Sequence, residues 1–177
     1  VTLSADGNTA YLADGSSGTQ IIDVSNKASP SLTATIGINL YDNHGVTLSA
    51  DGNTVFIGSY EYGLTIMDVS NPASPSSISF LDTFGYSDGV TLSADGNTAY
   101  VADRGGGLRI MDVSNPVSPS LINPSNFFYA NDVILSADGN TAYTTGQGLQ
   151  IIDISNHASP FLISTVNTPY YHAKSTE

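Results

Sequence analysis

The sequence predicts an all-β fold made of four copies of one unit. One phrase recurs almost unchanged: it reads VTLSADGNTAY from Val1, VTLSADGNTVF from Val46, VTLSADGNTAY from Val90 and VILSADGNTAY from Val133. A second marker has the same period, since an apolar run ends at Asp23, Asp68, Asp112 and Asp153. No apolar stripe at helical spacing is long enough to predict a helix. Copies of about 44 residues thus fill the 177-residue chain, a period typical of helix-pair solenoids or propeller blades.

Each copy reads as four short extended runs. In the third copy the runs are VTLS, TAYVAD, LRIMDVS and a last run that begins PSLIN. Asp-Gly separates the first two runs, and this pair is a strong hairpin signal because both residues tolerate positive φ. Val, Ile, Thr and Tyr dominate the runs, as packed strands prefer. The near-continuous apolarity of the third run predicts a strand that is covered on both faces.

We therefore predict a β-propeller with four visible four-stranded antiparallel blades that pack face to face around an axis. The blades are expected at about residues 1–45, 46–89, 90–132 and 133–177, within one repeat domain that covers residues 1–177. The segment from Val166 resembles the stretch before each later copy, and the chain has no initiator Met. We therefore expect a piece of a longer protein.

Two phrases carry a family resemblance. GLTIMDVSNPASP from Gly63 and GLRIMDVSNPVSP from Gly107, each preceded by LSADGNT and an aromatic residue, resemble LVIVD repeats. The resemblance implies a propeller of the kind found in bacterial and archaeal proteins, often secreted or on the cell surface, and it implies little about activity. Members often carry more than four repeats. Two arrangements therefore stay open: a small ring closed by packing of the first blade on the fourth, or four blades of a larger ring.

The charge balance limits the partners. Sixteen Asp and Glu face four Lys and Arg, which gives a net charge of −12. Such a surface repels phosphate backbones and anionic lipids, so we expect neither nucleic acid binding nor membrane insertion. The acidity favours either cation attraction, with Ca²⁺ as the candidate and no other cofactor expected, or simple solubility. Few Lys and no Cys fit an extracellular or cell-surface location.

The periodic aspartates are interpreted as turn residues. The DVSN or DISN phrase of each copy predicts an Asx-type turn ahead of the downstream proline. The SADGN phrase lacks the alternating acidic positions that a calcium loop needs, so a hairpin turn is the better interpretation.

The connections between copies differ most, and they hold the candidate site. They read YDNHG, GYSDG, FYAND and PYYHA, and in a propeller they gather at one mouth of the central channel. The predicted ligand-binding residues are Asp42, Asn43, His44, Tyr86, Ser87, Asp88, Asn131, Asp132, Tyr171 and His172. Loops between the second and third runs add Asp14, Glu61, Asp103 and Arg104. The alternative is a solvated rim of ordinary turn residues.

Weaker candidates concern metals and partner chains. Asp42, Asp88 and Asp132 are candidate oxygen ligands for a hard cation, and tyrosines at the mouth suit stacking on sugar rings. Phe127, Phe128 and Tyr129 form an aromatic cluster that suits either a partner chain or repacking of a terminal blade. His157, in a turn where other copies have Pro or Lys, is expected to be exposed.

No catalytic motif occurs, since nucleophile elbows, phosphate loops and Cys are all missing. The sequence therefore favours a non-catalytic extracellular or cell-surface module with a structural, adhesive or protein- or carbohydrate-binding role. Two alternatives remain. One is a propeller enzyme, a metal-assisted hydrolase or lactonase-like, with a cation at the channel mouth. The other is a subunit of a filament or surface assembly.

Overall fold

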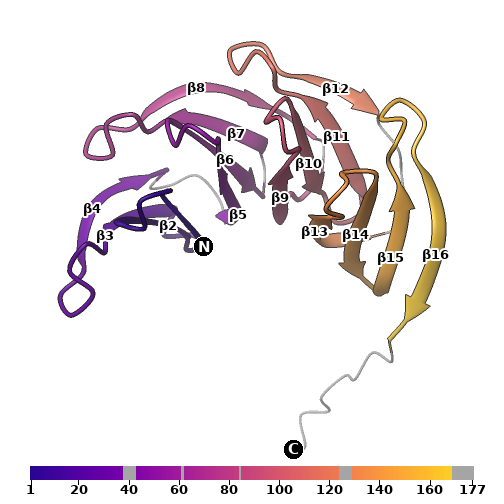
Figure 1. The fold of residues 1–177 in the computed structure, drawn as a ribbon, viewed down its shortest axis with the longest axis horizontal. Coiled ribbons are helices and arrows are strands. Elements are labelled where there is room, and N and C mark those ends of the chain that lie inside the picture. The colour runs from indigo at the N-terminus through magenta and orange to yellow at the C-terminus, as the bar shows by residue number, and fades with distance from the viewer. Residues whose placement is uncertain (38–42, 61, 84, 124–128, 169–177) are drawn as a thin grey trace, which may run out of the picture.

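The computed structural model describes residues 1–37, 43–60, 62–83, 85–123 and 129–168 (Figure 1). These residues form four four-stranded antiparallel sheets and no helix, which confirms the predicted all-β fold with four blades. None of them forms a helix that is long and apolar enough to cross a membrane. Each sheet keeps its strands in chain order, so each is a meander of consecutive hairpins.

The four sheets are named blades 1 to 4. Blade 1 comprises β1 (Thr2–Leu3), β2 (Thr9–Ala13), β3 (Thr19–Asp23) and β4 (Ser31–Ile36). Blade 2 comprises β5 (Asn43–Leu48), β6 (Thr54–Ser59), β7 (Gly63–Asp68) and β8 (Ser76–Leu81). Blade 3 comprises β9 (Gly89–Leu92), β10 (Thr98–Ala102), β11 (Leu108–Asp112) and β12 (Ser120–Asn123). Blade 4 comprises β13 (Ala130–Leu135), β14 (Thr141–Gly146), β15 (Gly148–Asp153) and β16 (Phe161–Asn167).

The repeated SADGN phrase forms the hairpin turn between the first two strands of each blade, as predicted. In blade 3, Ser93 Oγ donates to Asp95 Oδ1 at 2.6 Å and accepts from the Thr98 N–H at 3.0 Å. The same carboxylate oxygen accepts from the Asn97 N–H at 3.1 Å. Gly96 takes φ 73°, which only glycine adopts without strain. All the partners lie within five residues, so the phrase specifies its own turn.

Apolar side chains fill the spaces between neighbouring blades. Blades 1 and 2 share one cluster, blades 2 and 3 a second, and blades 3 and 4 a third. The third cluster contains Tyr100, Leu108 and Ile110 from blade 3 and Ile152 and Ile154 from blade 4. The third strand of an inner blade is therefore covered on both faces, as its apolar sequence predicted.

His157 is not exposed and idle, contrary to the sequence-based expectation. Its Nε2 lies 2.8 Å from the Tyr100 hydroxyl in a hydrogen bond, and the two rings meet edge to face at 5.7 Å. Burial raises the pKa of Tyr100 to about 12. The turn of blade 4 therefore reaches over the face of blade 3 and ties the two blades together.

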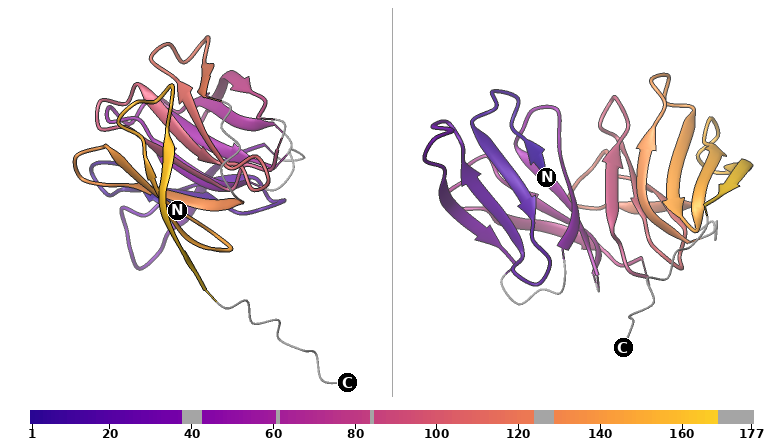
Figure 2. Two further views of the ribbon diagram at one scale, coloured as in Figure 1. Left: turned by 90° about the vertical axis from the view of Figure 1, so that its right-hand side faces the viewer. Right: turned by 90° about the horizontal axis from the view of Figure 1, so that it is seen from below.

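The blades stand side by side along an open arc (Figure 1). The first strand of each blade lies on the inner side of the arc and the fourth strand on the outer side. Blades 1 and 4 stand at the two ends, well apart, and the right-hand view of Figure 2 shows the same separation. The packing of blade 1 on blade 4 that a four-bladed ring requires therefore does not occur among the described residues. The arc agrees with the other arrangement, four blades of a larger ring.

Candidate functional site

The connections that enter β5, β9 and β13 place their side chains at one inner edge of the arc. Since β5, β9 and β13 start equivalent blades, His44, Asp88 and Asn131 occupy equivalent positions two residues before the blade's conserved Val. These three side chains, with Asp132, line a groove with a volume of about 510 Å³. The rest of its lining is Val1, Gly45, Val46, Gly89 and Val90. The structure thus brings four of the predicted ligand-binding residues together.

Asn43 and Ser87 sit one position earlier and are buried away from this groove. Asn43 Nδ2 donates to Thr19 Oγ1 at 3.2 Å, and Asn43 Oδ1 accepts from Ser59 Oγ at 2.9 Å. The Asn43 backbone also exchanges two hydrogen bonds of 3.1 Å with Gly15 of blade 1. The structure therefore places these two predicted ligand-binding residues at the joints between blades.

Asp103 is the buried centre of the joint between blades 2 and 3. Its Oδ1 accepts from Thr83 Oγ1 at 2.7 Å and from Ser87 Oγ at 3.0 Å. Its Oδ2 accepts from Arg109 Nε at 3.2 Å. Burial raises the pKa of Asp103, and these hydrogen bonds together with the Arg109 charge oppose that rise. Asp103 therefore stabilises the connection between blades 2 and 3, and as a fully buried side chain it is not exposed to solvent.

Asp88 differs because only one of its two oxygens is occupied. Arg104 Nε donates to Asp88 Oδ2 at 2.6 Å. Asp88 Oδ1 is buried and has no hydrogen-bond partner among the described residues. The side chain is 11% exposed, and His44 Nε2 lies 4.0 Å from Oδ1, beyond hydrogen-bond reach. An unsatisfied buried oxygen carries a free-energy penalty that a ligand's donor would remove.

Arg104 holds Asp88 at a conformational cost. Its φ is 37°, the one positive value outside glycine in the described chain, and the equivalent residue of blade 1 is Gly15 with φ 54°. Both residues form a two-way backbone bridge to the next blade, Gly15 with Asn43 and Arg104 with Ala130. The bridge requires a left-handed residue, which glycine supplies without strain. A strained arginine at this position points to a role for its side chain.

Aromatic rings lie next to the groove. Tyr60 and Tyr86 stack with ring centroids 3.9 Å apart. Arg104 Cζ lies 5.3 Å from the Tyr60 centroid and 5.9 Å from the Tyr86 centroid. Hydrogen bonding to Asp88 raises the pKa of Arg104, with smaller contributions from Tyr129 and Tyr60. We call Tyr60, Tyr86 and Arg104 the aromatic platform; Tyr86 and nearby Tyr129 are exposed.

The remaining predicted site residues divide into two groups. Six lie outside the described residues: Asp42, Glu61, Phe127, Phe128, Tyr171 and His172. Asp14 is described and exposed, but it does not line the groove. Within the described part of the chain, no three His, Cys, Asp or Glu side chains form a group suited to a metal ion. The weak metal candidates Asp88 and Asp132 share the groove with His44, but these three side chains do not form such a group.

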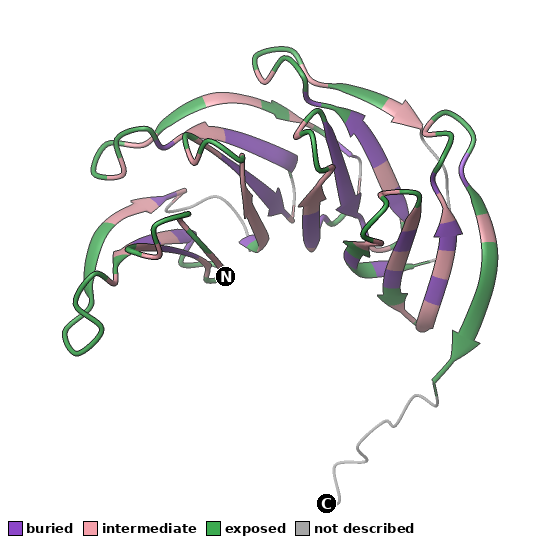
Figure 3. Ribbon diagram, viewed as in Figure 1, coloured by how far each residue is buried: buried purple, intermediate pink, exposed green. Residues whose placement is uncertain are grey.

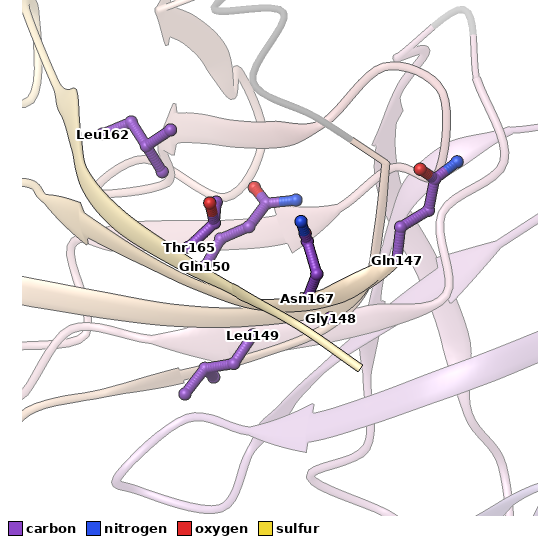
Figure 4. A pocket seen from close by; sticks show the side chains of 7 residues that line it. All are labelled: Gln147, Gly148, Leu149, Gln150, Leu162, Thr165 and Asn167. Carbon is purple, nitrogen blue, oxygen red and sulfur yellow. The ribbon is translucent and has the colours of Figure 1, made fainter. Parts of the chain in front are cut away.

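A second cavity lies against β15 and β16 of blade 4. Its volume is about 280 Å³, and Figure 4 shows the seven lining residues Gln147, Gly148, Leu149, Gln150, Leu162, Thr165 and Asn167. The sequence did not single out any of them. Gln150, Thr165 and Leu162 gather on one side of the sheet, while Leu149 points to the other side (Figure 4). This cavity contains no ionisable side chain, so it offers less chemistry than the inner groove.

Solved structures with similar folds perform different tasks. The periplasmic gluconolactonase of Pseudomonas aeruginosa aligns over 93% of this chain and 55% of its own, with 16% identity and a TM-score of 0.76. The hydrazine synthase of Kuenenia stuttgartiensis aligns over 91% and 47%, with 19% identity and a TM-score of 0.67. The Cps50 (Swd1) β-propeller domain of Myceliophteria thermophila aligns over 92% and 58%, with 13% identity and a TM-score of 0.69. The chain thus spans about half the length of these structures, and the likeness shows the fold alone.

Sequence comparison is more specific. No curated protein matches the chain. The model of the LVIVD repeat matches residues 2–36, 45–83, 85–126 and 129–168. Each match corresponds to one of the four blades and begins within a few residues of the start of that blade's first strand. Since the matches cover most of the sequence, the chain belongs to the LVIVD-repeat family.

Proposed function

We propose that this chain is a non-catalytic binding module of an extracellular or cell-surface protein, and that it binds a neutral carbohydrate in the inner groove. The observation that carries the proposal is Asp88 Oδ1, a buried acceptor without a described partner at the wall of a polar groove. A sugar hydroxyl is a donor of the right kind for such an oxygen.

The chemistry around Asp88 supports this ligand class. Asp132 adds a carboxylate acceptor, Asn131 an amide with both donors and acceptor, and His44 an imidazole, so the groove matches the mixed donors and acceptors of sugar hydroxyls. Tyr86 in the aromatic platform offers a ring for the apolar face of a sugar. The net charge of −12 disfavours phosphorylated or sulfated ligands.

The test is binding of neutral glycans on an array, followed by calorimetry with the best binder. Asp88→Asn removes one charge at the groove and weakens acceptance from the ligand, so we expect a loss of affinity of about 10-fold or more. The matched control is Asp95→Asn, which removes one charge in an exposed hairpin turn and leaves binding unchanged.

Two results would contradict the proposal. One is an array on which no neutral glycan binds, and the other is wild-type affinity in folded Asp88→Asn protein. Binding of a protein instead of a glycan at the same groove would show that the ligand is a protein and not a carbohydrate. A lactonase-like or metal-assisted hydrolase activity stays the alternative prediction, and lactone hydrolysis measured with and without added Ca²⁺ tests it.

A further inference from the structure

Arg104 changes the charge of the inner groove from behind its wall. Two carboxylates, Asp88 and Asp132, line the groove, and no lysine or arginine among the described residues lines it. Arg104 contacts this wall from outside the groove, because its Nε donates to Asp88 Oδ2 at 2.6 Å. The guanidinium therefore offsets one of the two carboxylate charges that face the groove.

The same contact decides which oxygen of Asp88 is available to a ligand. Oδ2 is used by the guanidinium, and Oδ1 is buried without a hydrogen-bond partner among the described residues. A carboxylate held in this way offers one oxygen, which suits a single O–H donor. A hard cation such as Ca²⁺ needs about six to eight oxygen ligands and binds more tightly as their negative charge increases. Asp88 paired with Arg104 is therefore a good acceptor for a hydroxyl and a poor ligand for a cation.

Two aromatic rings hold the guanidinium beside Asp88. Arg104 Cζ lies 5.3 Å from the Tyr60 centroid and 5.9 Å from the Tyr86 centroid, a separation at which a cation is attracted to the face of a ring. The hydrogen bond to Asp88 raises the pKa of Arg104, which keeps the side chain charged. The positive charge is therefore held at Asp88 by contacts on two sides.

The backbone does not require an arginine at this position. The bridge between Arg104 and Ala130 consists of two main-chain hydrogen bonds of 2.8 and 3.0 Å, and Gly15 forms the same kind of bridge with Asn43. Glycine adopts the left-handed conformation without strain, whereas Arg104 adopts it with φ 37°. The contribution of arginine here therefore comes from its side chain, which holds Asp88.

We propose that Arg104 determines the specificity of the inner groove for neutral hydroxyl ligands over cations. It orients Asp88 so that Oδ1 is left for the ligand, and it offsets the charge of the carboxylate. The hydroxyl ligand rests on the proposed function, whereas the weak cation binding depends on the Arg104–Asp88 pair alone. Without the guanidinium, both Asp88 oxygens, the Asp132 carboxylate and the Asn131 amide oxygen become available to a cation.

The experiment compares two affinities in the wild type and in Arg104→Gly, which removes the side chain and keeps a residue that adopts positive φ without strain. Calorimetry measures the affinity for the best neutral glycan. An NMR titration with CaCl₂, followed at the amides of Gly89 and Asp132, measures Ca²⁺ binding in the groove itself. We expect the glycan affinity to fall about 10-fold or more and the Ca²⁺ affinity to rise about 10-fold or more.

Lys27→Gln is the matched control, because it also removes one positive charge. Lys27 is exposed in the turn between β3 and β4, which Figure 3 shows as an exposed stretch of blade 1. The Val24 N–H donates to the Asn8 carbonyl at 2.8 Å, which places this turn beside the hairpin at the other end of the blade from the groove. Both affinities should therefore equal those of the wild type.

Further variants separate the charge of Arg104 from its shape. Arg104→Lys keeps the charge without the planar fork, so its Ca²⁺ affinity should stay as low as that of the wild type, and its glycan affinity should fall less than in Arg104→Gly. Adding Asp88→Asn to Arg104→Gly should abolish the gain in Ca²⁺ affinity. Arg104→Asn, which also tolerates positive φ, takes the place of the glycine variant if circular dichroism shows that the latter does not fold.

The two affinities fail independently. An unchanged Ca²⁺ affinity in the folded Arg104→Gly protein would overturn the proposal that Arg104 disfavours cations. An unchanged glycan affinity in the same protein would overturn the proposal that Arg104 orients Asp88 for the ligand. A wild-type protein that binds no neutral glycan would contradict the proposed function, and the Ca²⁺ titration would then test the role of Arg104 by itself.

Discussion

The two ends of each blade use aspartate in opposite ways. At the hairpin end, Asp95 and its counterparts in the other three copies are exposed and accept hydrogen bonds from residues two positions away. At the opposite end, where the chain passes from one blade to the next, Asp88 and Asp103 accept hydrogen bonds from side chains of other connections, such as Arg104 and Thr83. The hairpin aspartates recur in every copy. Asp88 has no aspartate at the equivalent positions His44 and Asn131, and Asp14, the counterpart of Asp103 in blade 1, is exposed.

The difference shows where this protein varies its repeat. A turn whose hydrogen bonds are all local can be copied unchanged, because it needs nothing from the neighbouring blade. A connection from one blade to the next must fit both blades, and the two junctions use different hydrogen bonds. At the first junction Asn43 bonds Thr19. At the second, Asp103 bonds Thr83 and Ser87. The candidate groove lies beside these junctions, so its residues vary with them.

The largest expected effect is on the free energy of unfolding when the buried Asp103 is replaced. Asp103→Ala removes the acceptor of three side-chain hydrogen bonds and leaves the Arg109 guanidinium, 11% exposed, without its carboxylate. We expect a loss of about 3–5 kcal/mol in the free energy of unfolding, measured by urea denaturation. Asp95→Ala at the hairpin end is the control and should cost clearly less. Equal losses of unfolding free energy in the two variants would show that the buried and the exposed aspartate stabilise the fold to the same extent.

A neighbouring pair of glycines gives the next largest effect. A Cβ on Gly106 would collide with Asp103 Oδ2 and lie 2.8 Å from Arg109 Nη2, so Gly106→Ala has to displace the buried ion pair. We expect a loss of about 1–3 kcal/mol. A Cβ on Gly105 meets nothing within 4 Å, and Gly105→Ala should stay within about 0.5 kcal/mol of the wild type in the same urea experiment. A loss at Gly105 as large as that at Gly106 would show that loop flexibility matters, not the space around Asp103.

The smallest expected effect is the pH dependence of folding stability, and its sign differs between Asp95 at the hairpin end and Asp103 between the blades. The Ser93 hydroxyl lowers the pKa of Asp95 below 3.8, so the stability from ionised Asp95 is present above pH 3.8 and is lost as the pH falls through the folded pKa. Burial raises the pKa of Asp103 above 3.8, so its contribution is complete below pH 3.8 and declines as the pH rises through the raised pKa.

Unfolding free energies from pH 7 down to about 3 test this contrast. The difference between wild type and Asp103→Asn should move in favour of the wild type as the pH is lowered from 7 to 4. The difference between wild type and Asp95→Asn should move against the wild type below pH 4. Curves that shift in the same direction for both variants would show that the two carboxylates are in similar environments.

Much of the fold was predictable because its signals are local. The SADGN phrase closes its turn through Asp95, Ser93 and Asn97, and such short-range hydrogen bonds form the same way wherever the phrase occurs. The candidate groove was predictable in part, since consecutive meanders must bring His44, Asp88 and Asn131 to one edge. Tyr60 was missed, because its stacking on Tyr86 joins two different connections. His157 was misjudged for a similar reason, since its partner Tyr100 lies in another blade.

The sequence by itself determined the period, the strand order and the turns, since each depends on residues only a few positions apart. The tertiary structure alone decided which aspartate is enclosed and which keeps a free oxygen, and it alone showed that the four blades form an open arc. These properties depend on how one blade docks on the next. Contacts such as Arg104 with Asp88 join residues whose separation in the chain says nothing about their distance in space.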